Sequence, residues 1–261
     1  MASANTGRTV NRWIRAYYDG YDVSGYTRSI GPLQLDYELP EMTCYADAIK
    51  TYLPNHPNGS VGTLNGVLDN TAGALHALAQ AGNGTSHIVT CVIGVRAEPL
   101  SGDPAFTGRF EQNSYQAVDA SGAIAINAQF GMWDASNEIN YANLWGMVLH
   151  ANDTETTANT DVGFDNDQSA ATTAFGGFFW YHLISADGSV TLSVDDAATN
   201  LNASFAPLVG ATSGLIAAAP AVGIVAIGTT ATVRQFLRWQ LAFTGGSTAT
   251  FVCGFNRRVK I

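Results

Sequence analysis

The chain has 261 residues, of which 46% are apolar and only 13% are charged, and its formal net charge is −9 at pH 7. This length holds one large all-β domain or two ordinary ones, each with a real core. The low charge density predicts a surface of neutral polar residues, or one covered by other subunits, since soluble domains usually carry ~25% charged residues. The negative balance argues against a protein that grips nucleic acid, which needs Lys and Arg to displace counterions.

The charges are unevenly distributed along the chain. No Lys or Arg stands between Arg109 and Arg234. This acidity either keeps the protein in solution or serves a functional surface. The acidic residues of this span are twelve: Glu111, Asp119, Asp134, Glu138, Asp153, Glu155, Asp161, Asp165, Asp167, Asp187, Asp195 and Asp196.

Cysteine usage and hydropathy point to a chain made in the cytosol. Cys44, Cys91 and Cys253 are odd in number and widely spaced, and they are predicted to be reduced core residues. The N-terminus, MASANTGRTVNRW, lacks the apolar core of a signal peptide. The longest apolar run, residues 215–227, is too short to cross a bilayer and contains Pro220.

The first quarter of the chain changes from strand to helix periodicity. Residues 1–12 have no period and predict an arm, and residues 13–21 predict a strand that ends in the turn Asp19-Gly20. Residues 23–37 predict a strand in which Pro32 removes a ladder donor, which favours an edge strand or a bulge. A helix is then predicted from Met42, Tyr45, Ala46, Ile49, Tyr52 and Leu53, closed by Pro54.

The rest of the chain is predicted to form mainly strands. Residues 62–68 predict a short strand, and residues 71–81 a second helix capped by Thr71. A hairpin is predicted over 109–118 and 123–130, where Ile124, Ile126, Ala128 and Phe130 alternate with Asn127 and Gln129. Further strands are predicted over residues 87–95, 144–149, 178–184, 190–194, 222–227, 232–243 and 248–255.

These elements predict a mainly β fold. We expect a β-sandwich or barrel with one flanking α-helix over residues 1–140, followed by a second, jelly-roll-like β-sandwich over residues 141–261. The boundary falls in a loop-rich zone between residues 134 and 174, which is rich in Asp, Asn, Thr and Ala.

Motifs that carry chemistry are weak in this sequence. No G-x-S-x-G, H-E-x-x-H or Walker motif occurs, and His56, His76, His87, His150 and His182 are far apart, so no catalytic residue, cofactor or metal is predicted. The acidic run Asp161, Asp165, Asn166 and Asp167 lacks the glycine and glutamate of a calcium loop. The aromatic set Trp133, Trp145, Trp180 and Tyr181 either stacks on sugars or, as we favour for Trp180, fills the core.

The chain resembles the major tail proteins of long-tailed bacteriophages, the tail-tube family. The resemblance rests on DVSGYTRSIG, on the strand end LDYE, and on YADAIKTYLP before the Gly-rich GTLNGVLDN. The stretch from residue 188, with VRQFLRWQLAF, is similar to an accessory β-domain of larger tail proteins. The turn at residues 54–59 departs from the family pattern, and the similar segments cover about half of the chain.

The resemblance implies a structural virion protein, made in the host cytoplasm, that is not an enzyme. Its copies would join edge to edge into rings, hexameric rather than trimeric, and the rings would stack into a tube with other virion proteins. DNA would pass as a repelled cargo along an acidic wall. The residues that we expect in these contacts are Arg8, Arg12 and Arg15 of the N-terminal arm and its strand, Pro32, and Asp47.

Two alternative functions remain open from the sequence. A capsid decoration protein, or another virion surface protein, is also built of β-sandwiches and is also oligomeric, but it forms small closed oligomers without filaments. A carbohydrate-binding receptor-recognition module would use the aromatic set, in particular Trp133 and Trp145.

Overall fold

The computed structural model describes residues 11–37, 41–44, 49–50, 57–95, 97–120, 122–132, 144–157, 164–165 and 174–258. The N-terminal part contains the helix α1 (Leu75–Gly82) and short 3₁₀ turns at Asn11–Trp13 and Ser24–Tyr26. Its strands are β1 (Ile14–Tyr18), β2 (Tyr21–Asp22), β3 (Thr27–Ile30), β4 (Leu33–Tyr37), β5 (Pro57–Val67), β6 (Ser86–Ile93), β7 (Pro104–Ala120) and β8 (Ala123–Met132).

The C-terminal part consists of strands and one further 3₁₀ turn, Asn202–Ser204. Its strands are β9 (Trp145–Glu155), β10 (Phe164–Asp165), β11 (Gly177–Ala186), β12 (Ser189–Ala197), β13 (Ala206–Ile216), β14 (Ala221–Ile227), β15 (Phe236–Thr244) and β16 (Ala249–Arg257).

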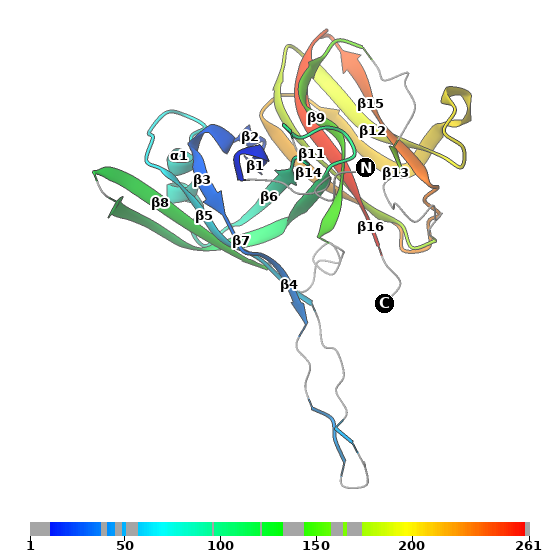
Figure 1. The fold of residues 1–261 in the computed structure, drawn as a ribbon. Coiled ribbons are helices and arrows are strands. Elements are labelled where there is room, and N and C mark those ends of the chain that lie inside the picture. Colours follow the sequence, from blue (N-terminus) through cyan, green and yellow to red (C-terminus); the bar gives the residue numbers. More distant parts are fainter. Residues whose placement is uncertain are drawn as a thin grey trace, which may run out of the picture.

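All of these strands belong to two sheets (Figure 1). The larger sheet has twelve strands and runs β14-β11-β16-β9-β7-β6-β1-β2, and β8, β5, β3 and β4 continue it from β7. The smaller sheet has four strands in the order β10-β15-β12-β13. The predicted fold class, a mainly β protein of β-sandwich type with one α-helix, is confirmed.

The chain buries three hydrophobic cores. In the N-terminal part, Phe106, Phe110 and Phe130 pack with Leu75 of α1. In the C-terminal part, the smaller sheet packs against β11 and β16 and buries Phe179 and Phe251. The third core lies between the two parts and is formed by Tyr17, Val92, Ala105, Val148, Trp180 and Val252.

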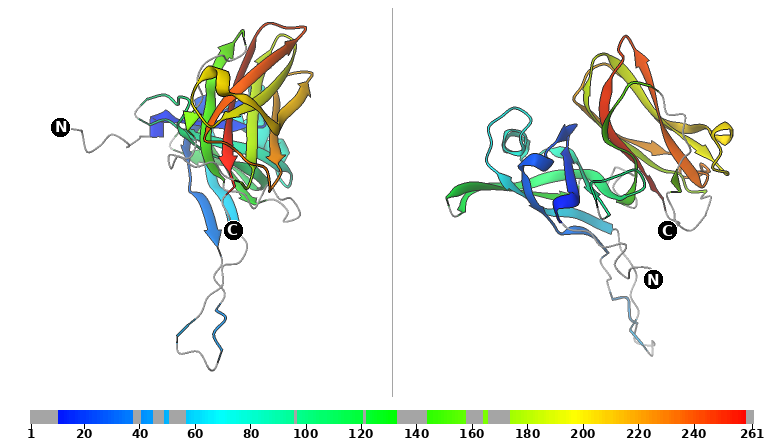
Figure 2. Two further views of the ribbon diagram at one scale, coloured as in Figure 1. Left: turned by 90° about the vertical axis from the view of Figure 1, so that its right-hand side faces the viewer. Right: turned by 45° about the horizontal axis from the view of Figure 1, so that its top comes forward.

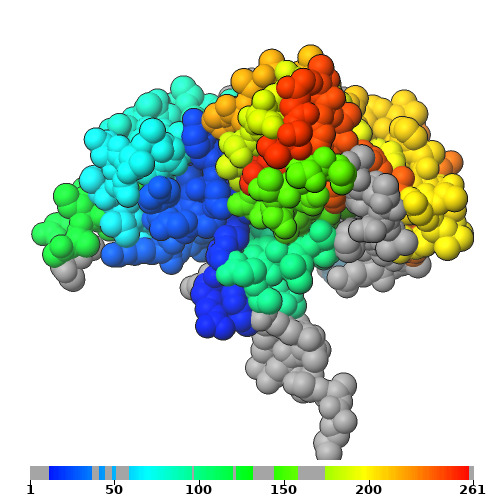
Figure 3. All heavy atoms as spheres, turned by 90° about the horizontal axis from the view of Figure 1, so that it is seen from above, coloured from blue at the N-terminus to red at the C-terminus, as the bar shows by residue number. Residues whose placement is uncertain are grey.

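The two parts lie at opposite ends of the body, as Figure 3 shows by colour from blue to red. They are nevertheless joined by backbone pairing, because Pro104, Ala105 and Phe106 of β7 pair with Met147, Gly146 and Trp145 of β9. The predicted division at residue 140 falls outside the described residues, and one sheet contains strands from both sides of it. The division into two domains therefore stays a prediction.

The helix predictions have opposite outcomes. The second predicted helix is confirmed as α1, whose Leu75 and Ala79 are buried. The helix predicted from Met42 to Leu53 is wrong where the chain is described, since residues 41–44 and 49–50 are not helical and Met42 and Ile49 are exposed. The physical reason is that these side chains have no core to cover, because β4 and β5 project away from the body here (Figures 1 and 2).

The strand predictions are mostly confirmed, but β13 and the two-residue strands β2 and β10 were not predicted. The hairpin of β7 and β8, the turn at Asp19-Gly20 and strands β11, β12, β14, β15 and β16 lie where the alternation predicted them. Strand β13 was not predicted, because Pro207, Gly210 and Gly214 interrupt its pattern. Its pairing with β12 is correspondingly irregular, with register shifts on both sides of Ser193.

A buried ion pair fixes the loop between β12 and β13. Asp195 Oδ2 accepts hydrogen bonds from Arg238 Nε (3.1 Å), Arg238 Nη2 (3.0 Å) and Gln240 Nε2 (2.9 Å). The Arg238 guanidinium also donates to Asn202 in this loop, and it lies 4.5 Å from the ring centre of Phe205. Both charged residues are less than one-tenth exposed.

Removing one partner of this pair should cost stability. We expect Asp195→Ala to lower the free energy of unfolding by about 3–5 kcal/mol, because Arg238 stays buried without its carboxylate. Urea unfolding followed by circular dichroism measures the loss. The control is Asp36→Ala on the exposed side of β4, which should stay within about 0.5 kcal/mol of the wild type. Equal effects of the two substitutions would contradict the prediction.

Candidate assembly surface

Pro32 lies between the edge strands β3 and β4, and the register of pairing with β5 continues through it without a bulge. Strands β3 and β4 both pair with β5, and among the described residues they have no other strand partner. Gly31 N donates to Thr63 O (2.9 Å), and Gly62 N donates to Pro32 O (2.8 Å). A Cβ atom on Gly62 would lie only 2.4 Å from Pro32 Cδ, so this close approach requires the glycine. Among the described residues, the second edge of β4 therefore has no strand partner, whereas that of β3 faces β1 across a small hollow.

A second free edge belongs to β7. Residues 105–111 of β7 pair with β6, and this pairing stops where Glu111 lies opposite Ser86, the first residue of β6. From Ser114 to Ala120, β8 is the only strand in the described chain that pairs with β7. The strands β7, β8, β5 and β3–β4 thus form a four-strand-wide sheet with unpaired backbone at both margins. Unpaired edges of this kind are templates for pairing with another chain.

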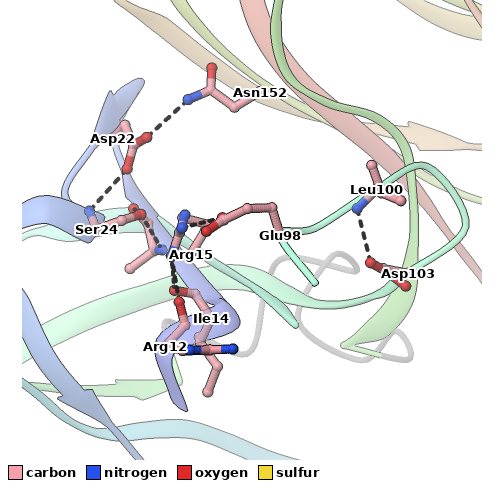
Figure 4. A network of polar contacts seen from close by, with 10 residues as sticks. Arg12, Ile14, Arg15, Asp22, Ser24, Glu98, Leu100, Asp103 and Asn152 are labelled. Carbon is pink, nitrogen blue, oxygen red and sulfur yellow. Dashed lines mark hydrogen bonds and ion pairs between the residues drawn. The ribbon is translucent and has the colours of Figure 1, made fainter. Parts of the chain in front are cut away.

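Arg15 is held by its own chain (Figure 4). Its Nη1 donates to Arg12 O (3.0 Å) and Ile14 O (3.1 Å), and its Nη2 donates to the Glu98 carboxylate. The Arg15 side chain is 28% exposed and that of Glu98 is 63% exposed, so solvent screens much of this ion pair. The Arg15 side chain thus connects the start of β1 to the loop after β6, as a brace between the two.

The same region links the N-terminal part to β9. Asp22 accepts from Ser24 N (2.9 Å) with one carboxylate oxygen and from Asn152 Nδ2 (2.9 Å) with the other. Figure 4 shows the side chain of Asn152, a residue of β9, directed at Asp22. In the loop after β6, Asp103 accepts from Leu100 N (2.9 Å). None of these contacts was predicted, and the one between Asp22 and Asn152 depends on the arrangement of strands far apart in sequence.

The other predicted assembly residues are placed only in part. Arg12 is exposed, and its guanidinium lies 4.8 Å from the ring centre of Trp13. Arg8 and Asp47 lie outside the described residues. The structure therefore leaves Arg12 as the solvent-facing cation of the described N-terminal segment, separate from the brace formed by Arg15.

A small hollow separates β1 from β3. Ile14 and Ala16 line it on one side and residues 27–30 line it on the other. Its volume is about 20 Å³, which is room for about one water molecule. It is too small to hold a substrate.

The buried histidine His182 ties the two parts of the chain together. Its Nδ1 accepts a hydrogen bond from Gly20 N (3.1 Å), so its Nε2 carries the proton and donates to Thr90 Oγ1 (2.8 Å). Thr90 in turn lies 2.6 Å from Thr107 Oγ1. Burial lowers the pKa of His182 to about 3, which keeps the ring neutral. The network joins β11 to the first turn, to β6 and to β7.

His87 lies nearby, but its surroundings raise the pKa of the ring rather than lower it. Its Nδ1 faces the Asp19 carboxylate (2.5 Å), and its Nε2 faces Gly82 O (3.0 Å). Burial lowers the pKa of His87, but the hydrogen bonds to Asp19 and Gly82 outweigh burial and raise it above its ordinary value. Both ring nitrogens point at acceptors, which favours the imidazolium.

The two histidines should give stability opposite pH dependences. A free imidazole titrates near ~6.5. For His182 the unfolded chain binds more protons below this pH, so stability falls as the pH is lowered toward about 3. For His87 the folded chain binds more protons, so its contribution is complete below the unfolded pKa and is lost as the pH rises through the folded pKa.

Urea unfolding over the pH range tests this difference. We expect the stability loss caused by His182→Asn, which keeps an acceptor for Gly20 N, to shrink as the pH falls from about 7 to about 5. By contrast, the stability loss caused by His87→Gln should become smaller as the pH rises. The prediction fails if both variants lose a constant amount at every pH.

The remaining sequence candidates are placed as follows. Trp180 is fully buried, and its Nε1 donates to Asn256 Oδ1 (3.0 Å), so the core interpretation of Trp180 is confirmed. Trp145 is 36% exposed, and Trp133 lies outside the described residues. Of the predicted core cysteines, Cys91 and Cys253 are buried, but Cys44 is exposed because it follows β4 on the projecting segment.

The acidic run considered for calcium is described only at Asp165, in β10, and the rest of it lies outside the described residues. Within the described part of the chain, no three His, Cys, Asp or Glu residues gather as a metal site. No helix in that part is long and apolar enough to span a membrane.

Comparisons with known proteins find remote likeness among solved structures. No family model and no curated protein matches the chain. Among solved structures, the chain is similar to the Dit protein (gp 19.1) of phage SPP1, described as a paradigm of the hub adsorption apparatus in phages that infect Gram-positive hosts. The identity is 12%, the match covers 92% of this chain and 98% of that chain, and the TM-score is 0.33. At this TM-score the likeness carries no argument about fold or role.

Proposed function

We propose that this chain is a structural protein of a bacteriophage tail, whose copies pair edge to edge into rings that stack into a tube for DNA. The observation that carries the proposal is the four-strand-wide sheet of β7, β8, β5 and β3–β4, which has one free edge on each side. In this proposal the protein is not an enzyme, and its role is assembly with passive conduction. Other virion proteins would contact the ends of the tube.

The strand directions support a ring. Each neighbouring pair in this sheet is antiparallel, so β7 and β4 run in opposite directions at the two margins. When copies are related by rotation about one axis, β4 of one copy meets β7 of the next in antiparallel orientation. A head-to-tail contact of this type closes into a ring if the rotation closes. Every unpaired backbone group of the two edges would then gain a partner.

The composition of the two margins supports the same contact. The exposed side chains of β3 and β4 include Arg28 and Gln34, and those of β7 include Gln116 and Asp119. Interfaces are depleted in Lys and Glu, and this chain has only 13% charged residues. The number of copies in a ring follows from the rotation between neighbours, and we favour six.

The test blocks one edge while leaving the pairing with β5 in place. Because Gly62 N donates to Pro32 O, alternation along β4 directs the N–H of Gln34 toward β5 and that of Leu35 outward. We expect Leu35→Pro to give monomers by light scattering and no rings in negative-stain images, because the outward donor is lost.

Two controls separate loss of the edge from loss of the fold. Leu35→Val keeps the outward N–H group and should keep the rings. Val209→Pro changes the exposed edge of the other sheet, in a part of β13 without registered pairs, and should also keep the rings. Intact rings from Leu35→Pro would contradict the proposal, and small closed oligomers from the wild type would favour a decoration protein.

The N-terminal segment is proposed to connect successive rings. Arg8 and Arg12 would contact acidic residues of the neighbouring ring, while Arg15 braces its own chain through Glu98. We expect deletion of residues 1–12 to leave single rings that do not stack, as seen by electron microscopy and sedimentation. Tubes of unchanged length after the deletion would refute this role.

A further inference from the structure

The free edge of β7 presents its backbone groups at alternate residues. Ile124 O accepts a hydrogen bond from Leu68 N beside β5 (2.9 Å), so the odd-numbered residues of β8 direct their backbone groups to β7. Gln116 is registered with one of these residues, and its own backbone groups therefore face β8. The N–H and C=O groups of Tyr115 and Ala117 consequently point out of the free edge. Residues of this parity can exchange backbone hydrogen bonds with another copy.

Partly buried apolar side chains mark both free edges on one face of the sheet. Leu33 and Leu35 on β4, and Tyr115 on β7, pack against the hydrophobic core of the N-terminal part. The Tyr115 hydroxyl contacts Nδ1 of His76 on α1, which holds the ring on this face. Ala117 follows on the same face and is exposed. In a single copy the core therefore reaches each edge with apolar surface still open to solvent.

From these observations we infer that the copies join in one register, in which Leu35 of one copy lies opposite Tyr115 of the next. Leu33 then lies opposite Ala117. The inference rests on the proposed function, and it names the residues that meet in the ring contact. Residues opposite each other in antiparallel strands point to the same face, so both apolar pairs join the core of one copy to that of its neighbour.

The opposite face of this contact is polar. In the inferred register Gln34 lies opposite Gln116, and Asp36 lies opposite Ser114. Two amides satisfy each other through hydrogen bonds, and a hydroxyl donates to a carboxylate. No carboxylate meets another one across the contact, an arrangement that would be destabilising. The contact therefore separates apolar pairs on one face from polar pairs on the other, as the strands inside the sheet do.

The strand β6 excludes the register that is shifted by two residues toward the start of β7. This shift would place Asp36 opposite Gln112. The backbone of Gln112 is already bonded on that side, since its N–H donates to Thr85 O (3.0 Å) and its C=O accepts from Gly84 N (2.8 Å). No free edge is available there for another chain.

Side-chain chemistry disfavours a shift by two residues toward the end of β7. Leu33 would then lie opposite Asp119, which is registered with Ile124 and shares the core face. A carboxylate there would have to give up water to cover an apolar side chain, which costs free energy. A shift by one residue in either direction is worse, because it would place the apolar side chains of one edge against the polar face of the other.

The stagger between copies gives an independent check. Within one copy, the row of paired residues that starts at Gln34 reaches β8 at Gly131. In the inferred contact Gln34 meets Gln116, whose partner on β8 is Asn127. Gly131 and Asn127 are four residues apart, so the four-strand-wide sheet carries a stagger of four residues. With a rise of ~3.3 Å per residue and a spacing of ~4.8 Å per strand, the strands tilt by about 35°, as in closed barrels.

Disulfide trapping tests the register. In a Cys44→Ser background, which removes the exposed native thiol, Gln34→Cys and Gln116→Cys are combined in one chain. Both positions are exposed. Their backbone groups point away from the contact, so their Cα atoms in neighbouring copies would lie about 4.5 Å apart, within the range of a disulfide. Within one copy they are separated by three strand spacings, about 14 Å, so no internal bridge forms.

Mild oxidation of rings should therefore give a ladder of covalent oligomers on a non-reducing gel. The largest species should contain as many copies as the ring, which also tests the preference for six.

The matched control combines Gln34→Cys with Val118→Cys in the same background. Val118 is exposed and lies two residues beyond Gln116 on the same face. In the inferred register its Cα atom is a diagonal neighbour of residue 34 at about 7–8 Å, at or beyond the limit for a disulfide. Bridging should therefore be several-fold weaker than with Gln116→Cys. In the register shifted toward the end of β7, the two pairs would exchange their yields.

Mixing two single-cysteine proteins tests whether the contact is head to tail. The Gln34→Cys and Gln116→Cys proteins, each with Cys44→Ser, should form covalent dimers when they are mixed and oxidised, and none when they are kept apart. Dimers of the Gln34→Cys protein alone would mean that two β4 edges meet across a two-fold axis, which would overturn the inference.

The outcomes separate this inference from the proposed function. If rings form but the pair with Val118→Cys bridges better, or neither pair bridges, the register is wrong and the ring proposal survives. If negative-stain images show no rings and no bridges form, the ring proposal and this inference fall together. Preferential bridging of Gln34→Cys with Gln116→Cys supports both.

Discussion

The fold depends on the point where the pairing of β7 with β6 stops and one edge of β7 becomes free. The buried Gln112 fixes this point. Its backbone N–H donates to Thr85 O (3.0 Å), and its carbonyl accepts from Gly84 N (2.8 Å). Its side chain donates to Ala79 O of α1 (2.6 Å) and accepts from Tyr18 Oη (3.1 Å). A buried amide needs all of these partners. These hydrogen bonds hold the start of β6 and the helix α1 against Gln112. They therefore also define where the free edge of β7 begins.

The second constraint holds the C-terminal sandwich against the N-terminal sheet. Backbone pairing between β7 and β9 covers three residue pairs, so it cannot fix the angle between the parts alone. The third core and the neutral His182 supply the rest, since Gly20 N donates to His182 and a Cβ on Gly20 would lie 2.9 Å from Ala221 backbone atoms. The sandwich is thereby kept beside the four-strand-wide sheet (Figure 2).

The sequence predicted those features that depend on local periodicity. Alternation on β8 placed Asn127 and Gln129 on one face, and Pro32 marked an edge strand. It could not predict features set by distant pairing. Gln112 lies in a polar stretch whose composition favours exposed side chains, yet α1 and β1 bury its side chain. The three-and-four spacing that begins at Met42 has the period of a helix but no core to pack against, and tertiary contact decides helix formation in such short segments.

The roles of the acidic residues could not be predicted for the same reason. A span without Lys or Arg predicts a negative surface in sequence, but folding distributes its acids among different roles. Asp187 accepts from Ser247 N (2.8 Å) and Thr248 N (2.9 Å), and these bonds lower its pKa to about 2, so it serves a turn. Glu155 pairs with the buried His150 (2.9 Å). An acidic span of sequence therefore does not define an acidic surface, because several of its carboxylates are engaged by hydrogen bonds and ion pairs within the fold.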